Sequence, residues 1–195
     1  GIQWMTAGSG LVHAEISSEE FKKHGGRVEI IQLWFNLPSH LKMAKPHYIG
    51  LQKEELPEWN SGDGSIRIVP VSGSWENTKG PVDAPTGIGI ASIYLKRGAR
   101  YNLTIDRDRT ILFYMVKGEV KVNGQPASMH QLVEFGSGEA GITMEALEDS
   151  LIILGHGTPY HEPIVAQGPF VMNSAAEIRQ AMADYQSGKM GHWEE

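Results

Sequence analysis

The chain has 195 residues, of which 41% are hydrophobic and 21% charged, as is usual for a globular protein long enough to bury a core. Its formal net charge of −6 and the absence of a Lys/Arg run argue against a nucleic-acid-binding face, and zero cysteines exclude disulfides, thiolate metal ligands and a cysteine nucleophile. No apolar run reaches transmembrane length and no basic-then-apolar leader opens the sequence, so we expect a cytoplasmic protein that binds neither membranes nor nucleic acids.

The N-terminal residues predict two short strands around a glycine-rich turn. Ile2–Met5 is an apolar strand, Thr6–Gly10 is the turn, and Leu11–Glu15 is a second strand. Alternate side chains of a strand project to the same face, so His13 and Glu15 are expected to point together into one cavity. An imidazole beside a carboxylate is half of a first-row metal site, because such an ion usually takes two further ligands.

Two longer segments follow before the pattern becomes regular. Val28–Leu37 is β-rich and apolar on both faces for much of its length, which predicts a central strand that Pro38 ends. The polar and irregular stretch 38–64 is expected to be a linker or a covering segment. Ser65–Ser72 alternates as a strand, and Pro70 within it predicts an edge position, because proline cannot donate to the ladder.

Short apolar runs separated by glycine turns then predict one complete small barrel, roughly over Pro85–Gly157. The stretch before it, Gly73–Thr86, is expected to be a long loop. The Asn123–Gly124 pair lies between apolar runs and is the strongest short signal for a hairpin. The strands expected in this barrel are Ile88–Leu95, Tyr101–Ile105, Thr110–Val116, Val120–Val122, Met129–Phe135, Met144–Leu147 and Leu151–Leu154.

The C-terminal region predicts an amphipathic helix over Ser174–Ser187. Ser174 and Glu177 have the spacing of a capping box, and Gly188 stands where a C-cap glycine belongs. The helical spacing of apolar residues gives one face that is expected to pack against a barrel; these residues are Ile178, Ala181, Met182 and Tyr185.

Three blocks of the sequence resemble the signature of the pirin family of bicupin proteins. They are Gln3–Gly10 with His13-Ala14-Glu15, then Gln32–Pro38, and finally Gly168–Asn173, which reads GPFVMN. The blocks stand in the family's order and are spread over almost the whole chain. Two shorter stretches, 116–120 and 135–139, are similar to the glycine-centred turns common in cupins.

The resemblance implies an all-β fold of double-stranded β-helix (cupin) barrels with a C-terminal helix. It divides the chain into residues 1–64, the remainder of a truncated first cupin domain with its linker; residues 65–157, a complete second cupin domain; and residues 158–195, a C-terminal segment and helix that pack on the barrels. A first domain that lacks several strands would expose apolar surface. We therefore expect either a second chain over that opening or a rearranged first domain with Gly168–Asn173 packed into it.

The resemblance also implies a metal site with His13 and Glu15 as ligands for Fe(II) or another first-row divalent metal. Pirins complete this site with an upstream H-x-H pair, which would lie before Gly1, so only these two residues carry over. We therefore expect the metal to be weakly held or absent in this chain.

Three functions remain open at this point. The first is an iron-dependent dioxygenase of the quercetin 2,3-dioxygenase type, which opens a small aromatic, flavonol-like substrate with O₂, with Glu15 as the base for the flavonol hydroxyl proton. The alternatives are a non-catalytic regulatory module that binds a protein partner or forms a homo-oligomer, and an inactive truncated remnant.

Other candidate residues are assigned structural roles. His156 and His161 lie in a Gly/Pro-rich stretch without a recognisable ligand spacing, so both are expected to be loop residues. The aromatic residues expected in the core are Trp4, Trp34, Phe35 and Phe170.

Overall fold

The computed structural model describes residues 1–136 and 141–192, and the chain divides into two compact units. Unit 1 comprises Gly1–Trp4 and Ile49–Pro159, and unit 2 comprises Met5–Tyr48 and Tyr160–Glu195. In the described part of the chain, no helix is both long enough and apolar enough to cross a membrane.

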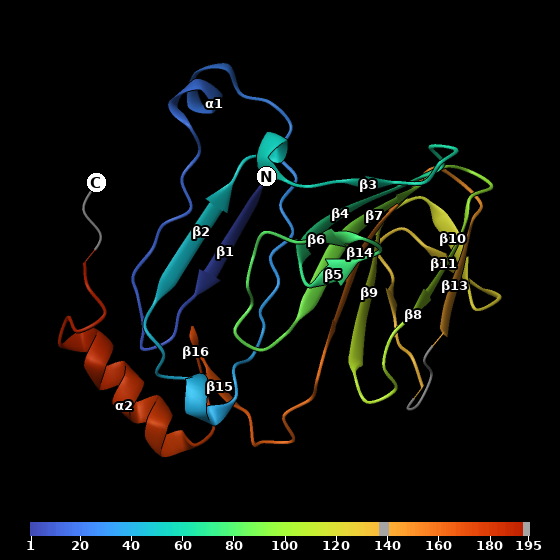
Figure 1. The fold of residues 1–195 in the computed structure, drawn as a ribbon. Helices are drawn as coiled ribbons and strands as arrows, with labels where there is room; N and C mark the ends of the chain where they lie inside the picture. Colours follow the sequence, from blue (N-terminus) through green and yellow to red (C-terminus); the bar gives the residue numbers. More distant parts are fainter. Residues whose placement is uncertain (137–140, 193–195) are drawn as a thin grey trace. The chain divides into compact units, whose positions relative to one another are not determined.

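Unit 1 contains two antiparallel sheets that form a barrel around one core (Figure 1). The larger sheet has the strands β3 (Trp59–Asn60), β4 (Ile66–Ser72), β7 (Gly89–Leu95), β9 (Thr110–Lys117), β12 (Leu132–Val133) and β14 (Ser150–Gly157), in the order β12-β9-β14-β7-β4-β3. The smaller sheet has β8 (Arg100–Thr104), β10 (Glu119–Val122), β11 (Gln125–Ser128) and β13 (Gly141–Ala146), in the order β11-β10-β13-β8.

The alternation of these strands explains where the core lies. In the larger sheet, Ile68, Ile93, Ile152 and Met115 stand opposite one another across four strands, and all four are fully buried. Residues that alternate with them project to the outer face of the sheet. The buried set continues through the smaller sheet in Tyr101, Val120, Val122, Ile142 and Met144.

Most of the strands predicted for the barrel are confirmed to within a few residues. The Asn123–Gly124 hairpin is also confirmed: Val122 stands opposite Gln125, and the two turn residues have φ values of 48° and 84°. The prediction for Met129–Phe135 is wrong in part, because only Leu132–Val133 is a strand and a turn precedes it. The proposed cupin-like turn at 135–139 extends beyond residue 136 and therefore lies largely outside the described residues.

Two predictions for the start of the barrel need correction. The expected loop Gly73–Thr86 contains a small hairpin of β5 (Ser74–Trp75) and β6 (Thr78–Lys79), whose Trp75 is buried in the core. β4 is the second strand from the edge of its sheet. The outer neighbour of β4 pairs only with Arg67 and Ile68, however, so Pro70 needs no hydrogen-bond donor on that side.

The remaining elements are short. β1 (Ile2–Thr6) pairs with β2 (His47–Leu51), and β15 (Val165–Gln167) pairs with β16 (Phe170–Met172), each as a two-stranded sheet. The helical elements are α1 (Glu19–His24), the 3₁₀ turns η1 (Ser39–Leu41) and η2 (Lys53–Glu55), and α2 (Ala175–Gln186). The stretch 38–64 is therefore more ordered than the predicted linker, because it contains β2, β3 and both 3₁₀ turns.

Two strands predicted near the N-terminus are absent. Leu11–Glu15 has no regular secondary structure, and neither does Val28–Leu37. The apolar side chains of the second stretch are largely exposed, with Ile30 at 73% and Trp34 at 65%, so Trp34 is not a core residue. A strand needs a neighbouring strand for its backbone hydrogen bonds, and among the described residues none pairs with this stretch.

The C-terminal helix is confirmed, with both ends as predicted. The Ser174 side chain accepts the amide hydrogen of Glu177, and the Glu177 carboxylate accepts the Asn173 amide and the Ser174 hydroxyl. Gly188 follows the helix at φ 75°, and Lys189 donates its amide to the Asp184 carbonyl in a Schellman arrangement. Ile178 is 1% exposed and anchors the apolar face, which packs on β15 and β16.

Candidate metal-ligand pair and its surroundings

The predicted ligands His13 and Glu15 lie in an exposed, irregular segment that follows the turn after β1. The base of this segment is fixed by backbone bonds: Ser9 donates to the Ala44 carbonyl at 2.9 Å, and Val12 donates to the Met190 carbonyl at 3.2 Å. Gly8 has φ 51° and passes so close to the Ala44 carbonyl that a β-carbon would collide with it. The turn is therefore firmly placed, whereas the two ligands stand beyond its last backbone bond.

Among the residues that the structure describes, Glu15 has one hydrogen-bond partner. Its Oε1 accepts a bond of 2.8 Å from the Nε2 of Gln32, which links the first and second motif blocks. Within residues 1–136 and 141–192, His13 has no hydrogen-bond or ion-pair partner, and its imidazole is exposed. The expected cavity with both side chains pointing into it is not formed, because the segment is not a strand.

The donor set can be compared with the needs of a first-row divalent metal. An imidazole and a carboxylate are suitable ligand types, but two donors leave most of the coordination sphere to other groups. Over the described parts of the chain, no group of three or more His, Asp or Glu side chains could hold a metal ion. His13 and Glu15 by themselves do not fit the complete metal site.

A polar cluster in unit 2 was not predicted from the sequence. The Lys42 side chain is 7% exposed, and its ammonium donates to the Asn36 side-chain oxygen and, at 2.9 Å, to the Leu37 carbonyl. Burial lowers the pKa of Lys42, and the nearby carboxylates of Glu162 and Glu177 oppose that shift.

Glu162 completes this cluster by joining two distant parts of the chain. Its carboxylate accepts the Ser39 amide at 2.7 Å and the Ser39 hydroxyl at 3.1 Å. It also accepts the Asn173 side-chain amide at 3.1 Å. These hydrogen bonds lower the pKa of Glu162. Asn36 and Asn173 are the asparagines of the second and third motif blocks. Their position in these blocks is the feature of the sequence that indicates a structural role for them.

The two histidines predicted to be loop residues differ in their surroundings. His161 is exposed in a loop, but His156 lies in β14, so the prediction is wrong for His156. Its Nδ1 accepts a 2.7 Å bond from the Arg109 Nε, and its ring packs against Trp75 with centroids 5.5 Å apart. Burial and then the Arg109 charge lower the pKa of His156 to about 4, so it is neutral at pH 7. His156 belongs to unit 1 and His161 to unit 2.

The barrel of two antiparallel sheets, with its hairpins and glycine turns, is that of a cupin protein. The Pirin C-terminal cupin domain family matches residues 90–191, a range that covers more than half of the chain. The chain therefore belongs to the pirin family.

Individual relatives agree with this assignment. Pirin-1 of Arabidopsis thaliana is 35% identical over 196 residues, covering 97% of this chain and 66% of the relative. Pirin of Homo sapiens is 34% identical over 195 residues, covering 97% of this chain and 65% of the relative. Among solved structures, a quercetin 2,3-dioxygenase from Acinetobacter baumannii matches with a TM-score of 0.92 and 33% identity, covering 97% of this chain and 66% of that one. The chain thus spans about two thirds of the length of these relatives.

Proposed function

We propose that the chain is part of a protein with quercetin 2,3-dioxygenase-type activity, which cleaves the ring of a flavonol-like substrate with O₂. In this proposal His13 and Glu15 are two ligands of an Fe(II) or other first-row divalent-metal site. The remaining ligands come from outside the described residues. The observation that carries the proposal is the likeness, over 97% of this chain, to a solved quercetin 2,3-dioxygenase.

Glu15 has a second role in this proposal, as the base that takes the flavonol hydroxyl proton. Gln32 donates to its Oε1 and so fixes the carboxylate, while Oε2 has no partner among the described residues. A carboxylate held by one oxygen and open at the other is suited to accept a proton from a bound hydroxyl. The same proposal assigns residues 1–64 to the first cupin domain, residues 65–157 to the second, and residues 158–195 to the segment that packs on them.

The test is metal loading of the chain followed by an oxygen-uptake assay. The metal-free chain is loaded anaerobically with Fe(II) and desalted, and its iron content is measured. We expect weak, substoichiometric loading that His13→Ala or Glu15→Gln abolishes, because two donors alone hold the ion loosely. His24→Ala, which removes an exposed histidine of α1, is the matched control and should leave the loading unchanged.

Activity is then followed as quercetin loss together with O₂ uptake. Turnover that rises with bound iron and disappears in the His13→Ala variant would support the dioxygenase. Equal loading of the His13→Ala and His24→Ala variants would contradict the ligand assignment. Bound iron without turnover would contradict dioxygenase activity of this chain by itself.

One observation favours a second candidate, a non-catalytic module that forms a homo-oligomer. The segment 28–34 exposes Val28, Ile30, Ile31 and Trp34, an apolar run that a water-exposed surface rarely carries. In this case the chain sediments as an oligomer, and Ile30→Ser with Trp34→Ser makes it monomeric. Met129→Ser removes an apolar side chain of the barrel that is 53% exposed, and it should not change the oligomeric state. A wild-type monomer at all concentrations would exclude this candidate.

A further inference from the structure

The larger sheet of unit 1 has a cavity of about 350 Å³ near the ends of its strands. We call it the outer cavity; the residues that matter below are Arg67, Tyr94, Lys96, Lys117, Asp149 and Leu151. All of them belong to unit 1, whereas His13 and Glu15 belong to unit 2. Three of the six carry a positive charge, although the whole chain has a net charge of −6.

The strand register places four of these side chains in one row. Arg67 stands opposite Tyr94, Tyr94 opposite Leu151, and Leu151 opposite Lys117. The neighbouring row, from Ile68 to Met115, is fully buried in the core, so this row projects from the outer face. Its two ends are cationic and its middle is an aromatic ring beside a leucine. The ends are three strand spacings apart, on the order of 14 Å between backbones.

A β-bulge puts Lys117 in this row. The register of β9 against β14 shifts between Leu151 and Ile152: Ile152 stands opposite Met115, whereas Leu151 stands opposite Lys117. Without the extra residue, Val116 would stand opposite Leu151 and the lysine would fall out of the row, because a one-residue shift exchanges the two faces. Gly118 follows at φ 79°, and a β-carbon there would lie 2.6 Å from the Asp149 carbonyl oxygen.

Arg67 is held in place at the other end of the row. Its guanidinium lies 3.7 Å from the centre of the Tyr94 ring and donates from Nη1 to Glu58 at 2.6 Å. A guanidinium has five N–H donors, so this one keeps others for a ligand. Stacking on the ring fixes its plane and lowers the entropy that is lost when a ligand binds.

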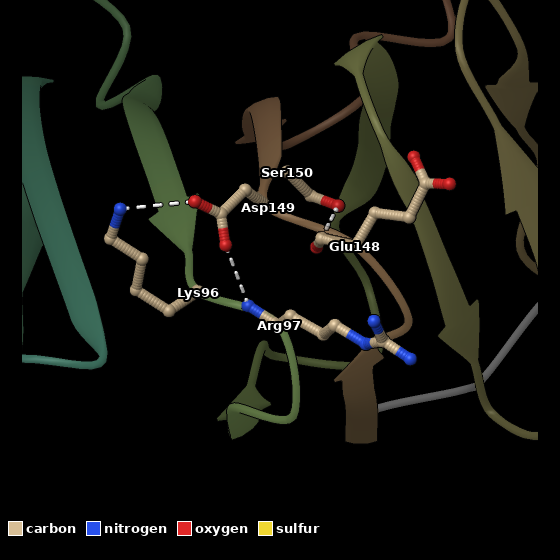
Figure 2. A network of polar contacts seen from close by, with 5 residues as sticks. All are labelled: Lys96, Arg97, Glu148, Asp149 and Ser150. Carbon is tan, nitrogen blue, oxygen red and sulfur yellow. Dashed lines mark hydrogen bonds and ion pairs between the residues drawn. The ribbon is translucent and has the colours of Figure 1, made fainter.

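The carboxylate inside the outer cavity already has partners (Figure 2). Asp149 accepts from Lys96 Nζ at 3.0 Å and from the Arg97 amide at 2.9 Å, and these bonds lower its pKa. The charge of Lys117 also contributes to the lowered pKa of Asp149, but within residues 1–136 and 141–192 this lysine has no hydrogen bond or close ion pair. The lysine opposite Leu151 is thus the cation that is open to a new anion.

We propose that the outer cavity binds a small organic anion. Its phosphate or carboxylate group lies on the Lys117 ammonium, its apolar or aromatic body lies on Leu151 and Tyr94, and the Arg67 guanidinium stands at the far end of that body. The volume is at the lower end of the range typical for small-molecule sites, and the combination of an apolar floor with charged groups that orient the ligand is found in such sites. This site needs no metal, so it is independent of the function proposed above.

The test is an NMR titration of the metal-free full chain at low salt with three probes. Phenyl phosphate and benzoate carry an aromatic body with different anionic groups, and inorganic phosphate carries no body. We expect saturable amide shifts around Tyr94, Lys117 and Leu151 with the two aromatic probes and weaker binding of inorganic phosphate. Comparison of phenyl phosphate with benzoate decides which anionic group the site prefers.

Variants test whether the probes bind in the outer cavity. Lys117→Gln should weaken binding of phenyl phosphate roughly tenfold, the effect of losing one charge-assisted hydrogen bond. Lys121→Gln removes an exposed lysine of β10 in the other sheet and should have no effect. Tyr94→Leu should weaken phenyl phosphate but not inorganic phosphate. Shifts scattered over all surface lysines, or equal effects of Lys117→Gln and Lys121→Gln, would overturn the proposal.

Discussion

The two units of the chain are held together by different physical means. Unit 1 has a continuous apolar core whose members, such as Phe113, Met115 and Leu154, are completely buried. In the described residues of unit 2, only Pro38, Lys42 and Ile178 are buried. The barrel therefore depends on the hydrophobic effect, whereas unit 2 depends on hydrogen bonds, helix caps and one buried ammonium group.

This difference indicates which unit should resist unfolding and which should open first. Hydrophobic burial accumulates over many contacts, so the barrel should unfold cooperatively. A few polar bonds contribute about 1 kcal/mol each, and regions with little buried apolar surface open locally at low free energy. We expect unit 2 to exchange its amide hydrogens faster than unit 1.

The largest effect is expected from a cavity in the barrel core. Phe113 is 0% exposed and packs against Phe135 with ring centroids 6.0 Å apart. Phe113→Ala should lower the free energy of unfolding by about 3–5 kcal/mol, measured by urea denaturation. Leu132→Ala, on the neighbouring strand β12 and 56% exposed, is the control and should change it by less than about 0.5 kcal/mol. Equal effects of the two changes would contradict the location of the core.

The next largest effect is expected on the stability of unit 2 alone, when Lys42 is replaced. Lys42→Met keeps the length of the side chain but leaves the Asn36 oxygen and the Leu37 carbonyl without their donor. Opening of unit 2 should become easier by about 2 kcal/mol, seen as faster hydrogen exchange in unit 2 with the barrel unchanged. Lys45→Met replaces an exposed lysine three residues away and should change neither unit. Faster exchange in the barrel core would show that the cluster is not confined to unit 2.

A third prediction concerns the pH dependence of the barrel. His156 is neutral in the folded state with a pKa of about 4, against about 6.5 for an unfolded chain. Protons therefore bind the unfolded state first, and stability is lost as pH falls from about 6.5 to about 4 and is then constant. Allowing for partial exposure, this loss should be about 1–2 kcal/mol.

The measurement is urea unfolding at several pH values, with the His156 pKa obtained by NMR. His156→Asn should remove this part of the pH dependence, and His24→Asn should keep it because that histidine is exposed. Asp106 opposes the downward shift, so Asp106→Asn should lower the pKa of His156 further. A measured pKa near 6.5 would contradict both the burial of His156 and its contact with Arg109.

The smallest effect should come from the cap of α2. Ser174→Ala removes the side-chain acceptor for the Glu177 amide and should destabilise the helix by about 1 kcal/mol. Ser174→Asp restores an acceptor and should recover most of that loss. Hydrogen exchange of the first turn of α2 measures both. Identical exchange in the two variants would mean that the cap bond does not stabilise the helix.

The sequence predicted those parts of the fold that local patterns determine. The Asn123–Gly124 turn, the α2 caps and most of the barrel strands depend on residues close in the chain, and all were found. Val28–Leu37 has the composition of a central strand, yet it is not one, because a strand also depends on a neighbour that the segment itself cannot specify. The same reason explains the absence of a strand at His13 and Glu15.

The candidate sites show the same division. His13 and Glu15 were found from a motif, which identifies residues but not the donors that complete a metal site. The sequence does not indicate that Lys42 is buried, because lysines are usually exposed and its hydrogen-bond partners are known only from the structure. The row from Arg67 to Lys117 could not be predicted either, since it depends on strand register and on one bulge.

The order of the two units along the chain has a consequence for how the protein folds during synthesis. Ile49–Pro159 is a continuous stretch that is synthesised before residues 160–195, so the barrel can begin to fold before unit 2 is complete. The bond between Ser39 and Glu162 spans 123 residues of sequence, a large loop to close in an unfolded chain. A barrel that has already folded reduces the length of flexible chain between Ser39 and Glu162. The amides of residues 5–48 should therefore remain unprotected from hydrogen exchange until residues 160–195 have been synthesised.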